Sequence, residues 1–313
     1  MKQVFTLSWT VDHSFEGVAV REFLKEHDIS KASLTDIKFR GGAIEVNGKH
    51  ATVRYILQKG DEIKVAFPPE KASESLLPKA IPLDIVYEDE YILVLNKQPN
   101  MPSIPSREHL TWSLSNAVLY YYEKNNINST VHLVNRLDRD TSGLLIVAKH
   151  RHVHYLFSKA QKEHEIKRVY RAFVHGKLVG KETIEAPIGR KESSIIEREV
   201  REDGQFAITH YTALRPYSSF TEVALSLETG RTHQIRVHMA YKGYPLLGDT
   251  LYGGTNHLIS RQALHSYELT FFHPFLQKTL SFTAPLPPDM QKLQIVDKSR
   301  FLNEKRLSFT RSD

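Results

Sequence analysis

The stretch Asn135-Arg136-Leu137-Asp138-Arg139-Asp140-Thr141-Ser142-Gly143-Leu144-Leu145 (residues 135–145) joins a charged loop to an apolar run that ends at Ala148. We expect residues 144–148 to form a buried strand, which places Asp138 at the edge of a sheet. An arginine stands on each side of Asp138, and a nearby cation typically lowers an aspartate pKa by about 1–3 units. An ionised carboxylate held in place can act as a nucleophile, a base or a metal ligand. A loop aspartate that only caps a turn is the commoner case.

A second segment, residues 166–176 (IKRVYRAFVHG), reads as a strand. Its alternation places Arg168, Tyr170 and Ala172 on one face and the odd-numbered residues off it. A tyrosine beside an arginine can stack on a nucleic-acid base and offer a hydroxyl group. An ordinary half-buried strand tyrosine explains the same pattern.

A third segment, residues 228–240 (ETGRTHQIRVHMA), predicts a helix from about 233 to 242 with Thr232 as its N-cap. Arg231 then lies at the helix entrance, where backbone N–H groups favour an anion such as a carboxylate or a phosphate. The turn-rich sequence GYPLLGD follows at 243–249.

In order and spacing, the three segments together closely resemble the RluA-type pseudouridine synthases. The shared pattern is R-L-D-x-x-T-S-G-L-L, then x-Y-x-A-x-V-x-G, then T-G-R-T-H-Q-I-R-V-H-M with G-x-P-L-L-G-D-x-x-Y-G, over about residues 81–290. The resemblance implies that Asp138 is the catalytic aspartate, Tyr170 the active-site tyrosine and Arg231 the basic residue that pairs with the aspartate. Two positions depart from the family pattern, which usually has histidine at Asn135 and lysine at Arg168.

The implied reaction breaks the bond from uracil N1 to ribose C1′, turns the base and joins C5 to C1′. No atoms enter or leave and no redox step occurs, so we expect no cofactor and no metal. The uracil must leave its stack at a cost of a few kcal/mol, and the Tyr170 ring can replace that stacking. Asp138 would attack C1′ or take the C2′ proton, and the sequence does not choose between these routes. The candidates for RNA contacts are Arg136, Arg139, Lys149, Arg168, His233, Arg236 and Lys31.

Residues 1–70 read as a separate small α+β unit. A helical face near residues 20–27 and a second helix near 33–39 precede the hairpin signal Asn47-Gly48 and a strand near 63–67. The unit resembles the S4-like RNA-binding domain, with Ser30-Lys31 where that family usually has Ser-Arg.

The rest of the chain divides into a polar linker (71–80), a catalytic domain (81–296) and a charged tail (297–313). Short apolar runs alternate irregularly with helical stretches near 112–123 and 152–162, and the sequence contains no G-x-G-x-x-G or Walker motif. This pattern indicates an α+β fold, and we expect a mixed, largely antiparallel central sheet.

Composition limits the compartment and the partners. Hydrophobic residues make up 41% and charged residues 25% of the 313 residues, as in globular proteins, and the net charge of +6 permits a polyanionic partner. The absence of cysteine excludes a disulfide and a thiolate nucleophile. With no signal-peptide pattern and no apolar run long enough to span a bilayer, we expect a cytoplasmic protein. The resemblance implies that it acts on structured RNA, and we expect ribosomal rather than transfer RNA and a monomer.

Three other interpretations compete with this one. Asp138 and Asp140 also suggest the Mg²⁺-dependent phosphoryl transfer of haloacid-dehalogenase-like phosphatases. A protein that binds RNA or assists ribosome assembly without turnover would fit the same composition. The alternating His150, His152 and His154 suggest a metal site, but no acidic residue is spaced to complete one, so we expect solvated surface there.

Overall fold

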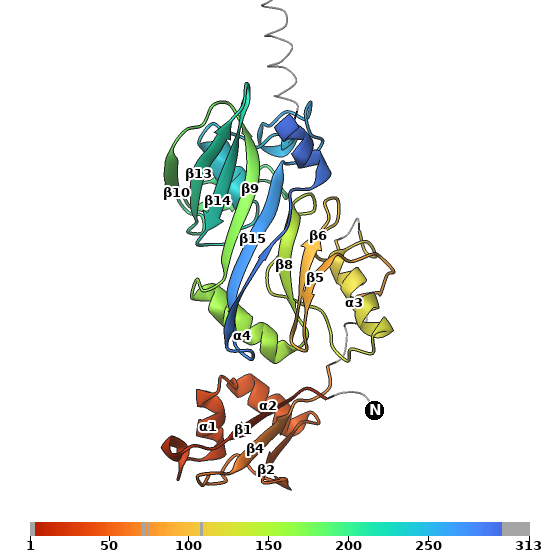
Figure 1. Cartoon of the computed structure of the whole chain (residues 1–313), viewed down its shortest axis with the longest axis vertical. Coiled ribbons are helices and arrows are strands. Elements are labelled where there is room, and N and C mark those ends of the chain that lie inside the picture. Colours follow the sequence, from red (N-terminus) through yellow and green to blue (C-terminus); the bar gives the residue numbers. More distant parts are fainter. Residues whose placement is uncertain (1–3, 71–72, 74, 107–108, 296–313) are drawn as a thin grey trace, which may run out of the picture.

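The computed structural model describes residues 4–70, 73, 75–106 and 109–295, which form a small N-terminal part and a larger part built on one long sheet (Figure 1). The predicted tail and part of the predicted linker lie outside the described residues. Among those described, no helix combines the length and apolar character that crossing a bilayer requires.

The N-terminal part is a four-stranded antiparallel sheet in the order β1-β4-β2-β3. Its elements are β1 (Thr6–Thr10), η1 (His13–Phe15), α1 (Val20–Glu26), α2 (Lys31–Phe39), β2 (Ala43–Val46), β3 (Lys49–His50) and β4 (Glu62–Ala66). Ser30 caps α2, because its hydroxyl accepts a hydrogen bond from the Ser33 N–H. Both predicted helices and the predicted hairpin are present, whereas β1 was not predicted.

The larger part is a ten-stranded sheet in which β10-β13-β14-β9-β15-β8-β6-β5 form one path, with β16 beside β15 and β7 beside β8. Only the β15–β8 pairing is parallel among the described strands, which confirms the mixed, largely antiparallel sheet. Its strands are β5 (Ile85–Glu88), β6 (Ile92–Lys97), β7 (His132–Leu133), β8 (Ser142–Ala148), β9 (Lys167–His175), β10 (Lys181–Glu185), β13 (Ile208–Pro216), β14 (Phe220–Leu227), β15 (Leu264–His273) and β16 (Lys278–Thr283).

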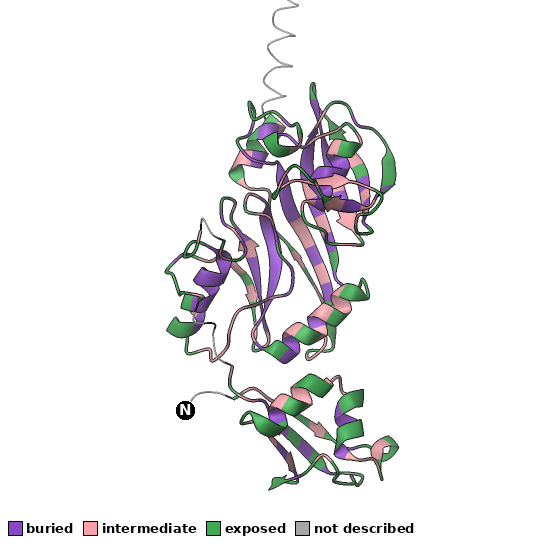
Figure 2. Cartoon of the chain, turned by 180° about the vertical axis from the view of Figure 1, so that it is seen from behind, coloured by how far each residue is buried: buried purple, intermediate pink, exposed green. Residues whose placement is uncertain are grey.

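Helices cover both faces of this sheet, and its central strands are buried (Figure 2). α3 (Leu114–Lys124) and α5 (Gln234–Tyr241) pack on the face that carries Leu145 and Tyr170. α4 (Arg151–Lys162) packs on the opposite face, against Leu144 and Ile146. A separate hairpin of β11 (Ile188–Arg190) and β12 (Arg198–Val200) lies near η2 (Thr250–Tyr252). Successive residues of β8 thus pack into hydrophobic cores on opposite faces of the sheet, which explains why the sequence of this strand is apolar without interruption.

Glycine is required where β8 begins. Gly143 has φ of +108°, and a Cβ added there would lie 2.2 Å from the Ser266 carbonyl oxygen of β15. Gly143 thus allows β8 and β15 to approach closely at their parallel pairing, directly after the Asp138 loop.

Two local predictions were wrong. Thr232 does not cap α5, since the residue before the helix is His233, in the left-handed region with φ of 59° and without a side-chain cap. The histidines near residue 150 are not solvated surface, because His150 and His152 are buried where the N-terminal part meets α4. Glu70, an acidic residue distant in sequence, faces His150 there.

Candidate active site

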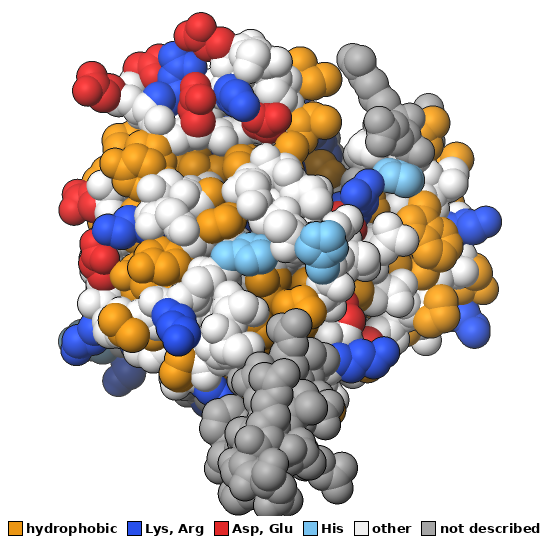
Figure 3. Space-filling model, turned by 90° about the horizontal axis from the view of Figure 1, so that it is seen from above, with side chains coloured by type: hydrophobic (Ala, Val, Ile, Leu, Met, Phe, Trp, Pro, Cys, Tyr) orange, Lys and Arg blue, Asp and Glu red, His pale blue; other side chains and the backbone are white. Residues whose placement is uncertain are grey.

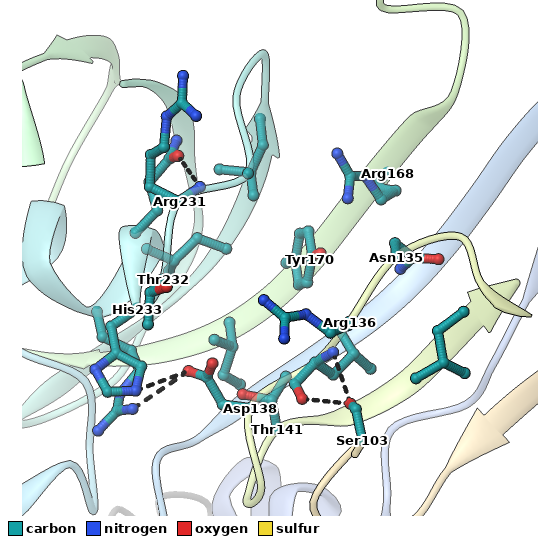
Figure 4. A pocket seen from close by; sticks show the side chains of 18 of the residues that line it. Ser103, Asn135, Arg136, Asp138, Thr141, Arg168, Tyr170, Arg231, Thr232 and His233 are labelled. Carbon is teal, nitrogen blue, oxygen red and sulfur yellow. Dashed lines mark hydrogen bonds and ion pairs between the residues drawn. The ribbon is translucent and has the colours of Figure 1, made fainter. Parts of the chain in front are cut away.

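A pocket of about 480 Å³ brings the three sequence segments together (Figure 4). The Asp138 loop enters from the start of β8, Tyr170 comes from β9, and residues 230–236 come from the turn before α5 and its first helical turn. Because segments about 100 residues apart converge here, this pocket is the candidate site.

Asp138 forms an ion pair with Arg236, not with Arg231. Its Oδ2 lies 3.2 Å from Arg236 Nη1, and its side chain keeps 27% of its surface exposed to the pocket. The carboxylate is therefore held at one oxygen and remains accessible to a ligand.

Arg236 is itself fixed by a second carboxylate. Its Nε and Nη2 donate to Asp249 Oδ2 and Oδ1 at 2.7 and 2.8 Å, a bidentate pair. Burial alone would lower the pKa of Arg236, but the carboxylates of Asp249 and Asp138 raise it, so the guanidinium stays charged. Asp249 belongs to the quoted G-D motif, yet no role was predicted for it.

Arg231 lines the pocket rim with its guanidinium directed away from Asp138 (Figure 4). Its Nε donates to the Phe206 carbonyl at 3.0 Å. The predicted pairing of Arg231 with the aspartate is thus wrong. The partner is Arg236, which had been expected to contact RNA.

His233 completes the surroundings of Asp138. Its Nε2 lies 4.0 Å from Asp138 Oδ2, and its Nδ1 lies 2.7 Å from the Tyr252 hydroxyl. That hydroxyl also accepts the Arg198 N–H. When its own proton points to Nδ1, the neutral imidazole carries its hydrogen on Nε2, facing Asp138. Burial lowers the pKa of His233, which favours this neutral form.

Buried donors hold the backbone of the Asp138 loop. The Ser103 hydroxyl donates to the Leu137 carbonyl at 2.6 Å, and the Lys97 ammonium donates to the Arg139 carbonyl at 3.0 Å. Arg261 Nη1 donates to the Asp140 carbonyl at 2.9 Å. None of these three donors was predicted from the sequence. Only Lys97 could have been noticed there, because it is a charged residue directly after the apolar run ILVLN.

The strand β9 presents its predicted face to the pocket. Arg168, Tyr170 and Ala172 are buried on that face, as expected from the alternation, and the Tyr170 ring stands beside the Asp138 loop (Figure 4). Asn135 also lines the pocket, and its Oδ1 accepts the Ile146 N–H at 3.0 Å.

The remaining predicted RNA contacts are scattered. Arg136 and Arg139 line the pocket, and Arg139 also pairs with Asp140. Lys149 lies beyond the far end of β8, roughly 20 Å along the strand, where it pairs with Glu88 at 2.5 Å. Lys31 is exposed at the start of α2. Lys149 is therefore outside the pocket and does not belong to this site.

One end of the molecule has a mixed charge pattern. Figure 3 shows the end of the molecule opposite the N-terminal part, where lysine and arginine of the described residues are spread around the rim and acidic side chains gather at one edge. Over the described part of the chain, no cluster of three or more histidine, aspartate or glutamate residues is arranged to hold a metal ion.

Comparisons with known proteins agree with this geometry. The family model for RNA pseudouridylate synthase matches residues 91–241. The RNA pseudouridine synthase YjbO of Bacillus subtilis is 56% identical over 277 residues, 88% of this chain and 98% of the relative. Ribosomal large subunit pseudouridine synthase D of Neisseria meningitidis serogroup A is 36% identical over 279 residues, 85% of this chain and 74% of the relative.

A solved structure supports the fold. Human RNA Pseudouridylate Synthase Domain Containing 1 superposes with a TM-score of 0.56 at 24% identity, covering 68% of this chain and 87% of that one. The α+β fold predicted from the sequence is thereby confirmed, and it is not the fold of a haloacid-dehalogenase-like phosphatase.

Proposed function

The chain belongs to the RluA-type RNA pseudouridine synthases, and from that premise we propose that it isomerises a uridine of ribosomal RNA with Asp138 as the catalytic residue. The enzyme is an intramolecular isomerase, and its substrate is RNA. The observation that carries the proposed role is the accessible Asp138 carboxylate, fixed by Arg236 in a pocket beside an aromatic ring.

Asp138 would act on the sugar of an everted uridine. Either its carboxylate attacks C1′ as the N1–C1′ bond breaks, or it removes the C2′ proton to give a glycal. Both routes need a carboxylate aimed at the sugar, and the Arg236 guanidinium holds Asp138 Oδ2 while His233 lies on the same side. Tyr170 would stack on the everted base, a contact worth roughly 1–3 kcal/mol.

Ribosomal RNA is favoured over transfer RNA by the names of several relatives. Five of them, 33–39% identical to this chain, are ribosomal large subunit pseudouridine synthases D. We propose the same substrate class here, with the particular uridine to be found by experiment.

The N-terminal part would add RNA affinity. We propose that residues 1–70 form an S4-like RNA-binding domain attached to a catalytic domain over 81–296, and that Lys31 contacts phosphate. Its helix, helix and hairpin order supports this assignment. Lys31 is exposed at the start of α2, where it is free to reach a phosphate.

The test is a pseudouridine map of total RNA from cells with and without this gene, followed by in vitro modification of the mapped RNA. Wild-type protein should restore the missing pseudouridine, and Asp138→Asn should abolish it while RNA affinity changes less than about threefold. Near-normal turnover by the Asn variant would overturn the role of Asp138. If no ribosomal pseudouridine disappears without the gene, the proposed substrate class is wrong.

A further inference from the structure

Arg168 is a buried cation that no group in the described part of the chain neutralises. Only 8% of the residue is exposed, on the pocket face of β9. Its guanidinium has no ion pair or hydrogen bond to any described residue, and its Nε is fully buried without a partner. Arg171, three residues along the same strand, also has a buried Nε without a partner, but its Nη1 lies 3.6 Å from the Glu222 carboxylate.

Asn135 lines the same pocket and carries an amide nitrogen that is buried without a partner just behind the pocket wall. The residue is 5% exposed, and its Oδ1 is occupied by the Ile146 N–H. This bond orients the amide so that Nδ2 remains, and Nδ2 has no partner among the described residues. Figure 4 shows Asn135 and Arg168 on the pocket wall beyond Tyr170, away from Asp138.

Folding alone does not explain this arrangement. A guanidinium nitrogen and an amide nitrogen that are buried without partners both destabilise the folded protein, because each has lost its hydrogen bonds to water. Unpaired groups of this kind in a pocket mark a place where a ligand supplies the missing partner. Here both groups are donors, so the missing partner is an acceptor, and the fixed positive charge of arginine favours an anion.

We propose that Arg168 and Asn135 form a subsite for one backbone phosphate of the RNA, next to the uridine that stacks on Tyr170. The guanidinium offers two parallel donors that match the oxygens of a phosphate, and the Asn135 amide, covered in this structure, adds a third once it turns toward the ligand. Uracil fits less well, because its carbonyl oxygens accept hydrogen bonds but carry no negative charge to match the guanidinium. Arg168 lies one strand repeat, about 7 Å, beyond Tyr170, which puts the phosphate beside the everted base rather than beneath it.

The subsite deepens the proposed function and rests on it, since it assumes that RNA occupies this pocket. The subsite also explains why this sequence has asparagine at 135 and arginine at 168, where the family pattern usually has histidine and lysine. Both departures lie on this one wall, and arginine in place of lysine supplies a fork rather than a single point charge.

The experiment measures binding of a stem-loop RNA centred on the mapped uridine, using the full chain with Asp138→Asn so that the RNA is not converted. Each phosphate near the uridine is replaced in turn by an uncharged methylphosphonate. Arg168→Met should weaken binding about ten- to hundredfold and reduce the salt slope by about 0.7–0.9. Replacing one particular phosphate by methylphosphonate should weaken RNA binding by a similar factor when the protein retains Arg168. The same replacement should not change RNA binding by the Arg168→Met protein. Asn135→Ala should show the same dependence on the same phosphate, more weakly.

Arg171→Met is the matched control, since it removes an arginine from the other face of the same strand. It should leave the salt slope and the methylphosphonate profile unchanged. Arg168→Met should melt without RNA at the same temperature as the Arg168 protein or higher, because it removes an unpaired buried charge. A lower melting temperature with an unaltered methylphosphonate profile would show that Arg168 is structural and overturn the subsite. Failure of the proposed function would give a different result from failure of the subsite, because the wild-type protein would then form no pseudouridine in the mapped RNA.

Discussion

The position of one arginine illustrates how closely the site depends on single residues. Arg231 and Arg236 are both in the quoted motif, five residues apart. The left-handed conformation of His233 separates them, so Arg231 precedes the helix and points outward while Arg236 lies in its first turn. Arg236 thereby joins two carboxylates, Asp138 and Asp249, and the second of these is almost completely buried.

We therefore expect opposite outcomes for the two arginines. Arg236→Gln should lower the rate of pseudouridine formation at least a hundredfold and destabilise the fold by about 3–5 kcal/mol, because it leaves Asp249 buried and unpaired. Arg231→Gln should change stability by less than about 0.5 kcal/mol and the rate by less than tenfold. Urea unfolding and single-turnover kinetics measure both quantities, and equal losses for the two variants would refute this assignment.

At the scale of elements, the end of β6 supports the catalytic loop. The Lys97 ammonium donates to the carbonyls of Gln98, Met101 and Arg139 at 2.8–3.0 Å, so it links the segment after β6 to the Asp138 loop. Burial lowers the pKa of Lys97 to about 7, against the opposing effect of the carboxylates of Asp140 and Asp138. Near neutral pH this lysine titrates inside the folded protein.

This shifted pKa predicts a pH-dependent contribution to stability. Between pH 7 and about 10 the unfolded chain keeps the Lys97 proton and the native chain releases it, so the free energy of unfolding rises with pH through this group. The wild type should therefore gain stability relative to Lys97→Met when urea unfolding is repeated at pH 7 and at pH 9.5. A difference between the two proteins that stays the same at both pH values would contradict the shifted pKa.

At the scale of the whole molecule, a compact contact joins the two parts. Glu70 follows the small sheet, and its carboxylate lies 2.5 Å from His132 Nε2 and accepts the Arg151 N–H at the start of α4. Aromatic rings of the small part stack on two histidines, Phe5 on His150 and Phe67 on His152. Two surface ion pairs, Arg151–Asp36 and Lys159–Asp28, flank this contact. The small domain therefore has a defined position relative to the pocket.

Acid should loosen this contact. Burial lowers the pKa of His150 and of His152 to about 4, so both are neutral in the docked state. Once exposed they titrate near 6.5, and the separated state therefore binds more protons between pH 6.5 and pH 4. Burial alone would raise the pKa of Glu70, but its hydrogen bond and charge interactions with His132, together with His150, lower it to about 2. Glu70 thus stabilises the docked state fully above about pH 4.5, and this contribution is lost as pH falls from 4.5 toward 2.

Small-angle scattering of the full chain checks this expectation. The radius of gyration should increase as pH falls from 7.5 to 5. His152→Phe keeps a ring against Phe67 without a titrating nitrogen and should shift the increase to lower pH. His210→Gln, at a half-buried position of β13 that takes no part in this contact, should not shift it. A radius that is constant over this range would rule out separation by histidine protonation.

The sequence alone determined the fold class and the elements that bear the site. The apolar run after Asp138 predicts β8, because a strand buried on both faces needs no polar alternation. The alternation around Tyr170 predicts which side chains of β9 share a face, because successive residues of a strand point to opposite sides. These are local properties, set by the spacing of apolar side chains.

Only the tertiary structure decided which charges meet. Arg236 rather than Arg231 pairs with Asp138, Lys149 lies far from the pocket, and Glu70 meets histidines more than 60 residues away. Such pairings depend on the directions of side chains and on the return of distant strands to one sheet, which local patterns do not encode. The absence of a partner for Arg168 Nε likewise depends on how every neighbouring side chain is placed, which the local sequence does not determine.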